Sequence, residues 1–247
     1  MKFNPFNYVR YFLEFVIIIT GVLLSFYLDD LRQLGEKESY KDTLIEELLV
    51  TSQEDLKQIE KITEDLTIVQ KNIAEILADI EDGKKDLNDA EVAEKYLFII
   101  QKMSVSFFPQ NGTFNQLIST GSIELIDSKE FRRVLLNNYT HYYDRNSANN
   151  RTLDDLYLAF GANIDPKITV TSTEQDDASF IYSDMVVSSY DIDQKFYLSN
   201  TFKAYLLTAQ SMVGKNIDML QIFSKSYREI IAPVSYTHLT LPTKEGV

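Results

Sequence analysis

The hydrophobic pattern separates an almost wholly apolar N-terminal segment from a long periodic remainder. Within residues 11–28 only Glu14 carries a charge, and at about 1.5 Å per residue the segment spans about 27 Å. That length nearly matches the hydrocarbon core of a bilayer. Tyr11 and Tyr27 lie at its ends, where amphipathic aromatic rings favour lipid headgroups. The pattern predicts a transmembrane helix at residues 11–28, preceded by a short flank at residues 1–10.

Two other interpretations of this segment are disfavoured. A cleaved signal peptide needs small residues before its cleavage site, but residues 25–27 read Ser-Phe-Tyr there. A buried core helix of a soluble protein would carry polar positions facing solvent, and residues 15–28 lack them. An uncleaved membrane anchor is therefore the preferred interpretation.

The span contains the residues that we single out for a functional role. A carboxyl group inside a membrane is costly, so Glu14 is a functional candidate. It lies about one turn from Arg10, and we favour a structural ion pair at spacing i, i+4 over proton transfer. Gly21 and Ser25 form a small-xxx-small pair that allows a second helix to approach closely.

The segment after Gly35 has the period of a long amphipathic helix. Ser39 is a candidate N-cap, Gly83 is a stop signal, and residues 39–82 would extend about 65 Å. The apolar face is wider than the seam of a two-stranded coiled coil, which favours an intramolecular bundle. Its members recur at steps of three and four: Leu44, Ile45, Leu48, Leu49, Ser52, Leu56, Ile59, Ile62, Leu66, Val69, Ile73, Ile76, Leu77 and Ile80.

Several shorter helices are predicted after this one. They cover residues 88–103, a short segment opened by a Thr113/Gln116 capping box, a segment capped by Asp127 or Ser128, and residues 150–161. Gly121 ends the second of these helices.

The C-terminal half contains one irregular region and one more long helix. Residues 166–193 predict a long loop with at most a short hairpin. Residues 197–230 regain the helical period and are the natural antiparallel partner of the first long helix. The predicted fold is all-α, with a transmembrane helix followed by an antiparallel bundle in an acidic extramembrane domain at residues 29–233.

Composition excludes several classes of function. The formal charge of −13 and the lack of a Lys/Arg cluster disfavour nucleic-acid binding, and the absence of Cys removes thiolate chemistry. His141 is the one histidine outside the C-terminal tail, and it reads as a packing residue rather than a catalytic one. Adjacent carboxylates do not converge on a helix, so we interpret them as a solvated acidic face: Glu46-Glu47, Glu54-Asp55, Glu64-Asp65, Asp154-Asp155 and Asp176-Asp177. We therefore predict no catalytic, cofactor or metal site.

Two blocks of the sequence resemble a known family. Residues 11–32 combine Glu14 with Ile-Ile-Ile-Thr-Gly-Val-Leu-Leu, and residues 114–126 read Phe-Asn-Gln-Leu-Ile-Ser-Thr-Gly-Ser-Ile-Glu-Leu-Ile. Phe131-Arg-Arg-Val-Leu and Tyr139 follow at the expected spacing. Together they resemble a DUF6090-like group of uncharacterised membrane proteins of Bacteroidetes-type bacteria. The resemblance implies a single-span inner-membrane protein, and it implies no activity, cofactor or site.

The C-terminal tail has a different character. Residues 234–247 match the translation of a transposase-type sequencing adapter, so we expect this tail to be foreign and the natural chain to be truncated near residue 232.

The sequence predicts location and construction more strongly than biochemical activity. We expect a membrane-anchored, non-enzymatic helical protein that acts in interaction or scaffolding at the bacterial envelope, with the bilayer and a protein partner or second copy as its contacts. Charges flanking the span nearly balance, and the basic N-termini of the resembled family favour a cytoplasmic N-terminus and a periplasmic domain. The alternatives are the sensor portion of a two-span receptor and a membrane-bound enzyme with an unrecognised carboxylate site.

Overall fold

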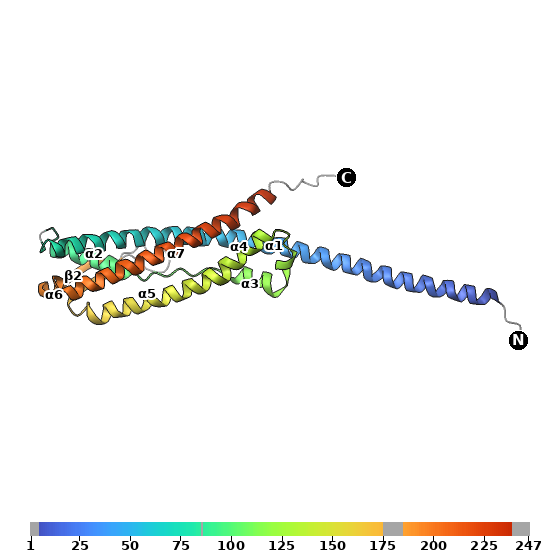
Figure 1. Cartoon of the computed structure of the whole chain (residues 1–247), viewed down its shortest axis with the longest axis horizontal. Helices are drawn as coiled ribbons and strands as arrows, with labels where there is room; N and C mark the ends of the chain where they lie inside the picture. The colour runs from blue at the N-terminus through green and yellow to red at the C-terminus, as the bar shows by residue number, and fades with distance from the viewer. Residues whose placement is uncertain (1–4, 85, 175–184, 239–247) are drawn as a thin grey trace.

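One very long helix organises the molecule. The structure, a computed structural model, describes residues 5–84, 86–174 and 185–238. Helix α1 (Pro5–Glu81) is 77 residues long and projects from a helical bundle as a free rod, shown in blue in Figure 1. Every residue from 10 to 40 is exposed, and burial begins at Leu44.

The predicted helix start at Ser39 is wrong, because α1 runs through Gly35 and Ser39 without a break. A lone glycine inside a helix costs only about 1 kcal/mol relative to alanine. Good helix formers flank it, and Arg32 pairs with Asp29 at 3.1 Å and with Glu36 at 3.3 Å on the helix surface. These local interactions offset the cost of the glycine, so the anchor segment and the bundle share one helix.

The bundle is built on the antiparallel pairing of α1 with α7 (Asn200–His238), as predicted. Lys203 bonds Glu81 at 2.6 Å at the far end of α1, and Tyr227 bonds Asp55 at 2.5 Å nearer the projecting rod. The predicted apolar positions of α1 are all buried or half-buried. Aromatic residues of α7 fill the other side of the core: Phe202, Phe223 and Tyr227.

The turn after α1 follows the predicted stop signal. Gly83 adopts a φ of 74°, and the amide of Lys84 bonds the carbonyl of Asp79 at 2.7 Å, which closes the helix end. Helix α2 (Asp89–Lys102) then begins with a capping box in which Asn88 and Glu91 bond each other's backbone amides.

A cluster of short elements lies at the rod end of the bundle (Figure 1). Helix α3 (Gly112–Ser119) starts after Asn111 without a side-chain cap, so the predicted Thr113/Gln116 capping box is wrong. The Gln116 side chain instead accepts a hydrogen bond from the Tyr40 hydroxyl at 3.3 Å, which attaches α3 to α1. The 3₁₀ turn η1 (Ser122–Leu125) follows Gly121, which has a φ of 71°.

One continuous helical segment covers the region where two separate helices were predicted. Ser128 caps α4 (Lys129–Leu136), accepting from the Phe131 amide at 3.1 Å, which confirms one of the two predicted caps. A π-helical turn, η2 (Asn137–Tyr142), then leads directly into α5 (Tyr143–Asn163). No Pro or Gly interrupts residues 129–160, so the polar run that suggested a new start at residue 150 does not break the helix.

The predicted irregular region is mostly a hairpin. Strand β1 (Ile168–Glu174) pairs antiparallel with β2 (Met185–Ile192), and Ile168 faces Ile192 at the open end of the register. The short helix α6 (Gln194–Tyr197) follows and leads into α7. Helix α7 continues beyond the predicted end at residue 230, and residues 239–247 of the predicted foreign tail lie outside the described residues.

Candidate functional site

The projecting part of α1 carries an exposed apolar surface. Large apolar side chains of residues 11–28 are between 41% and 69% exposed. Among the described residues, α1 is the one helix with a stretch long and apolar enough to cross a membrane. A helix that carries apolar side chains on every side is stable in lipid, whereas exposing those side chains to water is unfavourable.

The predicted candidates in this segment lie on an isolated helix. The Arg10 Nε donates to the Glu14 carboxylate at 3.0 Å, which is the local ion pair expected from the spacing. Gly21 has no atom within 4 Å of the position where a Cβ would stand. Gly21 and Ser25 are exposed, so the small-residue pair contacts no other helix among the described residues.

A buried polar cluster fastens α1 to α7 inside the bundle. Asp55 is fully buried, and its carboxylate accepts hydrogen bonds from the Tyr227 hydroxyl at 2.5 Å and the Gln110 amide at 3.0 Å. The Gln110 side chain adds a third donor at 3.2 Å. The hydroxyls of Tyr139 and Ser52 lie 3.5 Å apart in the same layer. Buried polar groups that find such partners specify one arrangement of the helices.

Burial controls the protonation of this cluster. It raises the pKa of Asp55 above its ordinary value, although the hydrogen bonds from Tyr227 and Gln110 act in the opposite direction. Burial also raises the pKa of Tyr139 to about 12, and it raises the pKa of Tyr227 together with the nearby Tyr139 and Asp55. The two phenols are therefore neutral at physiological pH.

The continuous segment η2–α5 presents further polar side chains to the interior. Asn146 and Asn150 donate to the Phe107 carbonyl at 2.7 and 3.1 Å, but their side-chain oxygens are buried without a partner. Asn138 is fully buried, and its side chain interacts with the Tyr227 hydroxyl. The unpartnered oxygens of Asn146 and Asn150 are positions that internal water molecules satisfy in proteins.

A second buried aspartate closes the far end of the bundle. Asp79 accepts from the Tyr197 hydroxyl at 2.7 Å and from the amides of Asp86 and Leu87 at 2.8 and 2.9 Å. Burial acts to raise the pKa of Asp79, but these hydrogen bonds and the charge of Lys84 leave it below the ordinary value. The site ties the turn after α1 to α6.

The prediction that the carboxylates form a solvated acidic face is wrong for Asp55 and Asp65, which are both buried, and the predicted pair Asp176-Asp177 lies outside the described residues. Glu54 is exposed as expected, but its neighbour Asp55 occupies a core position three residues after Ser52 and four before Ile59. The helical period was the signal that could have identified it, because a period of 3.6 places these positions on one face. His141 was predicted as a packing residue, but it is exposed, beside the Tyr142 ring at a centroid distance of 5.6 Å.

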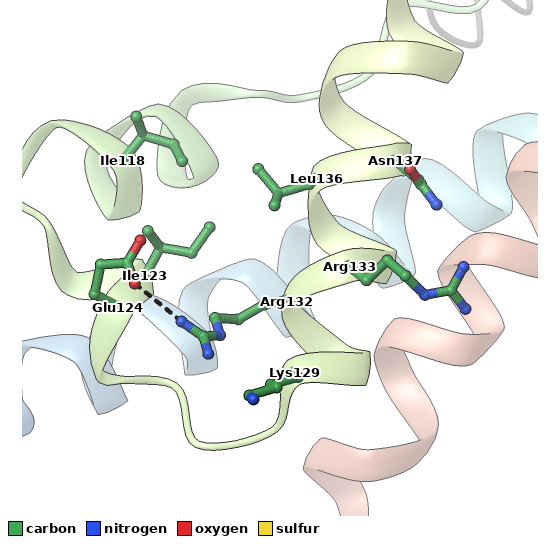
Figure 2. Close-up of a pocket in the computed structure, with 8 residues that line it drawn as sticks. All are labelled: Ile118, Ile123, Glu124, Lys129, Arg132, Arg133, Leu136 and Asn137. Carbon is green, nitrogen blue, oxygen red and sulfur yellow. Dashed lines mark hydrogen bonds and ion pairs between the residues drawn. The ribbon is translucent and has the colours of Figure 1, made fainter.

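Two surface grooves flank α4, and sequence reasoning identified neither. The first, the α3–α4 groove, has a volume of about 400 Å³ and lies between α3, η1 and α4 (Figure 2). Ile118 and Leu136 in it are 45% and 42% exposed. Figure 2 shows Arg132 reaching across to Glu124, which it bonds at 3.0 Å, with Lys129 one turn away. This surface combines apolar and cationic groups in an acidic protein.

The second groove, of about 320 Å³, lies between α4 and α7. Arg133 lines both grooves and pairs with Glu130, while Lys225 and Glu229 form the α7 side. Neither groove is lined by Asp55 or Asp79. Asp55 and Asp79 therefore hold helices together, whereas the grooves are accessible surfaces with mixed chemistry.

A comparison with protein-family models shows which family the chain belongs to. The model described as a family of unknown function, DUF6090, matches residues 14–179. The chain belongs to the DUF6090 family. The DUF6090 match begins inside the apolar segment of α1, includes both sides of the α3–α4 groove, and ends before β2 and α7. No curated protein and no solved structure shows significant similarity to the chain.

Proposed function

We propose that this DUF6090 protein is a membrane-anchored scaffolding or interaction protein without enzymatic activity. The observation that carries the proposal is the apolar, exposed segment at residues 11–28, which continues without a break into the bundle helix. In water this surface would be strongly unfavourable, and in a bilayer it is solvated. The accessible grooves carry mixed apolar and basic chemistry suited to binding another macromolecule.

Membrane fractionation of the full chain tests the anchor. We expect the protein to resist extraction by carbonate and high salt. The double substitution Ile18→Arg with Val22→Arg places two charges in the middle of the segment, at about 3 kcal/mol each, and should release the protein into the soluble fraction. Leu158→Arg is the matched control, because Leu158 is 66% exposed and Ile18 is 65% exposed. Salt release of the unchanged chain would contradict the anchor.

We further propose a cytoplasmic N-terminus and a domain in the periplasm, by analogy with the basic N-termini of the resembled family. The chain has no Cys, so a single introduced thiol reports its own side of the membrane. Ala148 is exposed on α5, and Ala148→Cys should react with a membrane-impermeant maleimide in intact spheroplasts. Reaction only after lysis would reverse the orientation.

A second candidate function is the sensor portion of a two-span receptor. The observation that favours it is the antiparallel course of α7, which returns the chain toward the rod end of α1 (Figure 1). The test is the genomic reading frame beyond residue 231. A second apolar stretch of about twenty residues followed by a signalling domain would replace the scaffold proposal.

A further inference from the structure

Contacts between helices show which residues of α1 stand at the same level as the α3–α4 groove, measured along the axis of α1. Tyr139 lies beside Ser52 of α1, and the α4–η2–α5 helix runs in the same direction as α1 (Figure 1). Arg132 precedes Tyr139 by about two turns, so it lies about 10 Å closer to the rod, at the level of residue 45. The Tyr40–Gln116 hydrogen bond places α3 at a similar level.

This inference rests on the proposed membrane anchor. Given that anchor, the distance of the groove from the bilayer excludes lipid headgroups as its occupant. Residue 45 lies about 25 Å along α1 from residue 28, where the predicted span ends. The headgroup layer extends only about 5–8 Å beyond the hydrocarbon. Even with a helix tilt of about 40°, residue 45 stays roughly 20 Å from the edge of the hydrocarbon along the membrane normal. A protein occupant is therefore favoured.

The outward face of α1 carries a strip that complements the groove. Asp42, Glu46 and Val50 follow one another at spacing four and face away from Leu44 and Leu48, which are each 1% exposed. Val50 is 55% exposed. The strip therefore presents two acidic groups and then one apolar group along the direction of α1.

The α4 side of the groove presents the complementary pattern along the same direction: two basic groups and then one apolar group. Lys129 and Arg132 are followed by the exposed Leu136. Measured from Tyr139 at about 1.5 Å per residue, these three residues lie at the levels of residues 42, 45 and 49 of α1. Two chains anchored in one membrane stand side by side with α1 parallel, so the strip of one chain meets the groove of the next in register.

We propose that the α3–α4 groove binds the α1 strip of a second copy of this chain. Asp42 pairs with Lys129, Glu46 pairs with Arg132, and Val50 packs against Leu136. The contact joins two different surfaces, so it is heterologous and extends into a ring or a row in the plane of the membrane. Confinement of the copies to one membrane raises their effective concentration and favours the contact.

Two of the ion pairs that must be exchanged each join an exposed carboxylate to a more covered cation. Arg132, with a side chain 25% exposed, bonds Glu124, which is 78% exposed, and Lys41, 17% exposed, bonds Asp42 at 3.0 Å, which is 63% exposed. Because both carboxylates are solvated, water screens these pairs, and an intermolecular pair for each cation offsets the one that it loses. The burial of Val50 and Leu136 adds an apolar gain that each chain lacks alone.

Disulfide cross-linking of the full chain in membranes tests the contact. Cells co-express Val50→Cys with one affinity tag and Leu136→Cys with another, and membranes are oxidised with copper phenanthroline. We expect a dimer that carries both tags. Leu158→Cys replaces Leu136→Cys as the control, because Leu158 is more exposed but lies toward the far end of α5. Adding Arg132→Glu to the Leu136→Cys chain should lower the mixed dimer about fivefold, and Glu46→Arg on the other chain should restore it.

The outcomes separate this inference from the proposed function. Loss of the unchanged chain from the membrane fraction would remove the anchor and this inference with it. Membrane-bound chains that give no more mixed dimer than the Leu158→Cys control would overturn the contact and leave the anchor intact. Protection of Leu136→Cys from maleimide without a mixed dimer would assign the groove to a different protein and likewise overturn the second-copy proposal.

Discussion

Replacing Tyr227 with Phe should weaken the joint between α1 and α7 by removing one hydroxyl. The substitution keeps the ring, and with it the edge contact to Phe107 and the stacked contact to Phe223, at centroid distances of 6.3 and 6.2 Å. The fully buried carboxylate of Asp55 loses its shortest hydrogen bond, of 2.5 Å, and keeps those from Gln110. A hydrogen bond to a carboxylate of this kind contributes about 2 kcal/mol.

That loss corresponds to about a 30-fold change in the unfolding equilibrium and a fall in Tm of about 4–8 °C. Urea unfolding of the full chain in detergent, followed by circular dichroism, measures it. The matched control is Tyr205→Phe, because Tyr205 is half-buried against Phe160 and its hydroxyl bonds none of the described residues. The control should change the free energy of unfolding by less than about 0.5 kcal/mol. Equal effects of the two substitutions would refute the assignment of a stabilising hydrogen bond to Asp55.

The remaining predictions use the same unfolding assay. The pKa of Asp55 is raised by folding, so the stability of the unchanged chain relative to Asp55→Asn should increase as pH falls from that raised pKa toward about 4. The pKa of Asp79 is lowered, so stability relative to Asp79→Asn should instead decrease as pH falls below about 4. In urea titrations, a slope of the opposite sign for either aspartate would contradict the prediction for that aspartate. Gly121→Ala should cost about 1–2 kcal/mol because the φ of 71° strains a side chain, and an unchanged urea midpoint would exclude that strain. Ser128→Ala should cost about 1 kcal/mol through loss of the bond to the Phe131 amide, and Ser128→Asp should largely retain it.

The long helices were predictable because their information is local. A repeat that places Leu44, Leu48 and Ile59 on one face already defines the core side of α1, and the matching repeat in α7 defines its partner. Helix ends signalled by Gly83 and Ser128 were also predictable, since backbone conformation and capping depend on the residue at that position.

The features that were missed depend on tertiary contacts or on a choice between two local signals. The π-helical turn at η2 depends on packing, because the local sequence at residues 137–142 does not distinguish it from an α-helical turn. Asp55 was assigned to the surface because it follows Glu54, although its position in the period argued for burial. The α3–α4 groove joins residues from separate elements, and no pattern along the chain brings Ile118 beside Leu136.

The continuity of α1 makes the proposed anchor and the bundle a single mechanical lever. From residue 28 to residue 81 the helix measures about 80 Å, so a change in tilt of about 10° at the bilayer would carry the far end of the bundle sideways by about 14 Å. A one-residue insertion in the exposed stretch at residues 29–40 would turn the whole bundle by about 100° about the helix axis while lifting it by only about 1.5 Å. The orientation of every surface on the domain is therefore set by the phase of one helix where it leaves the membrane.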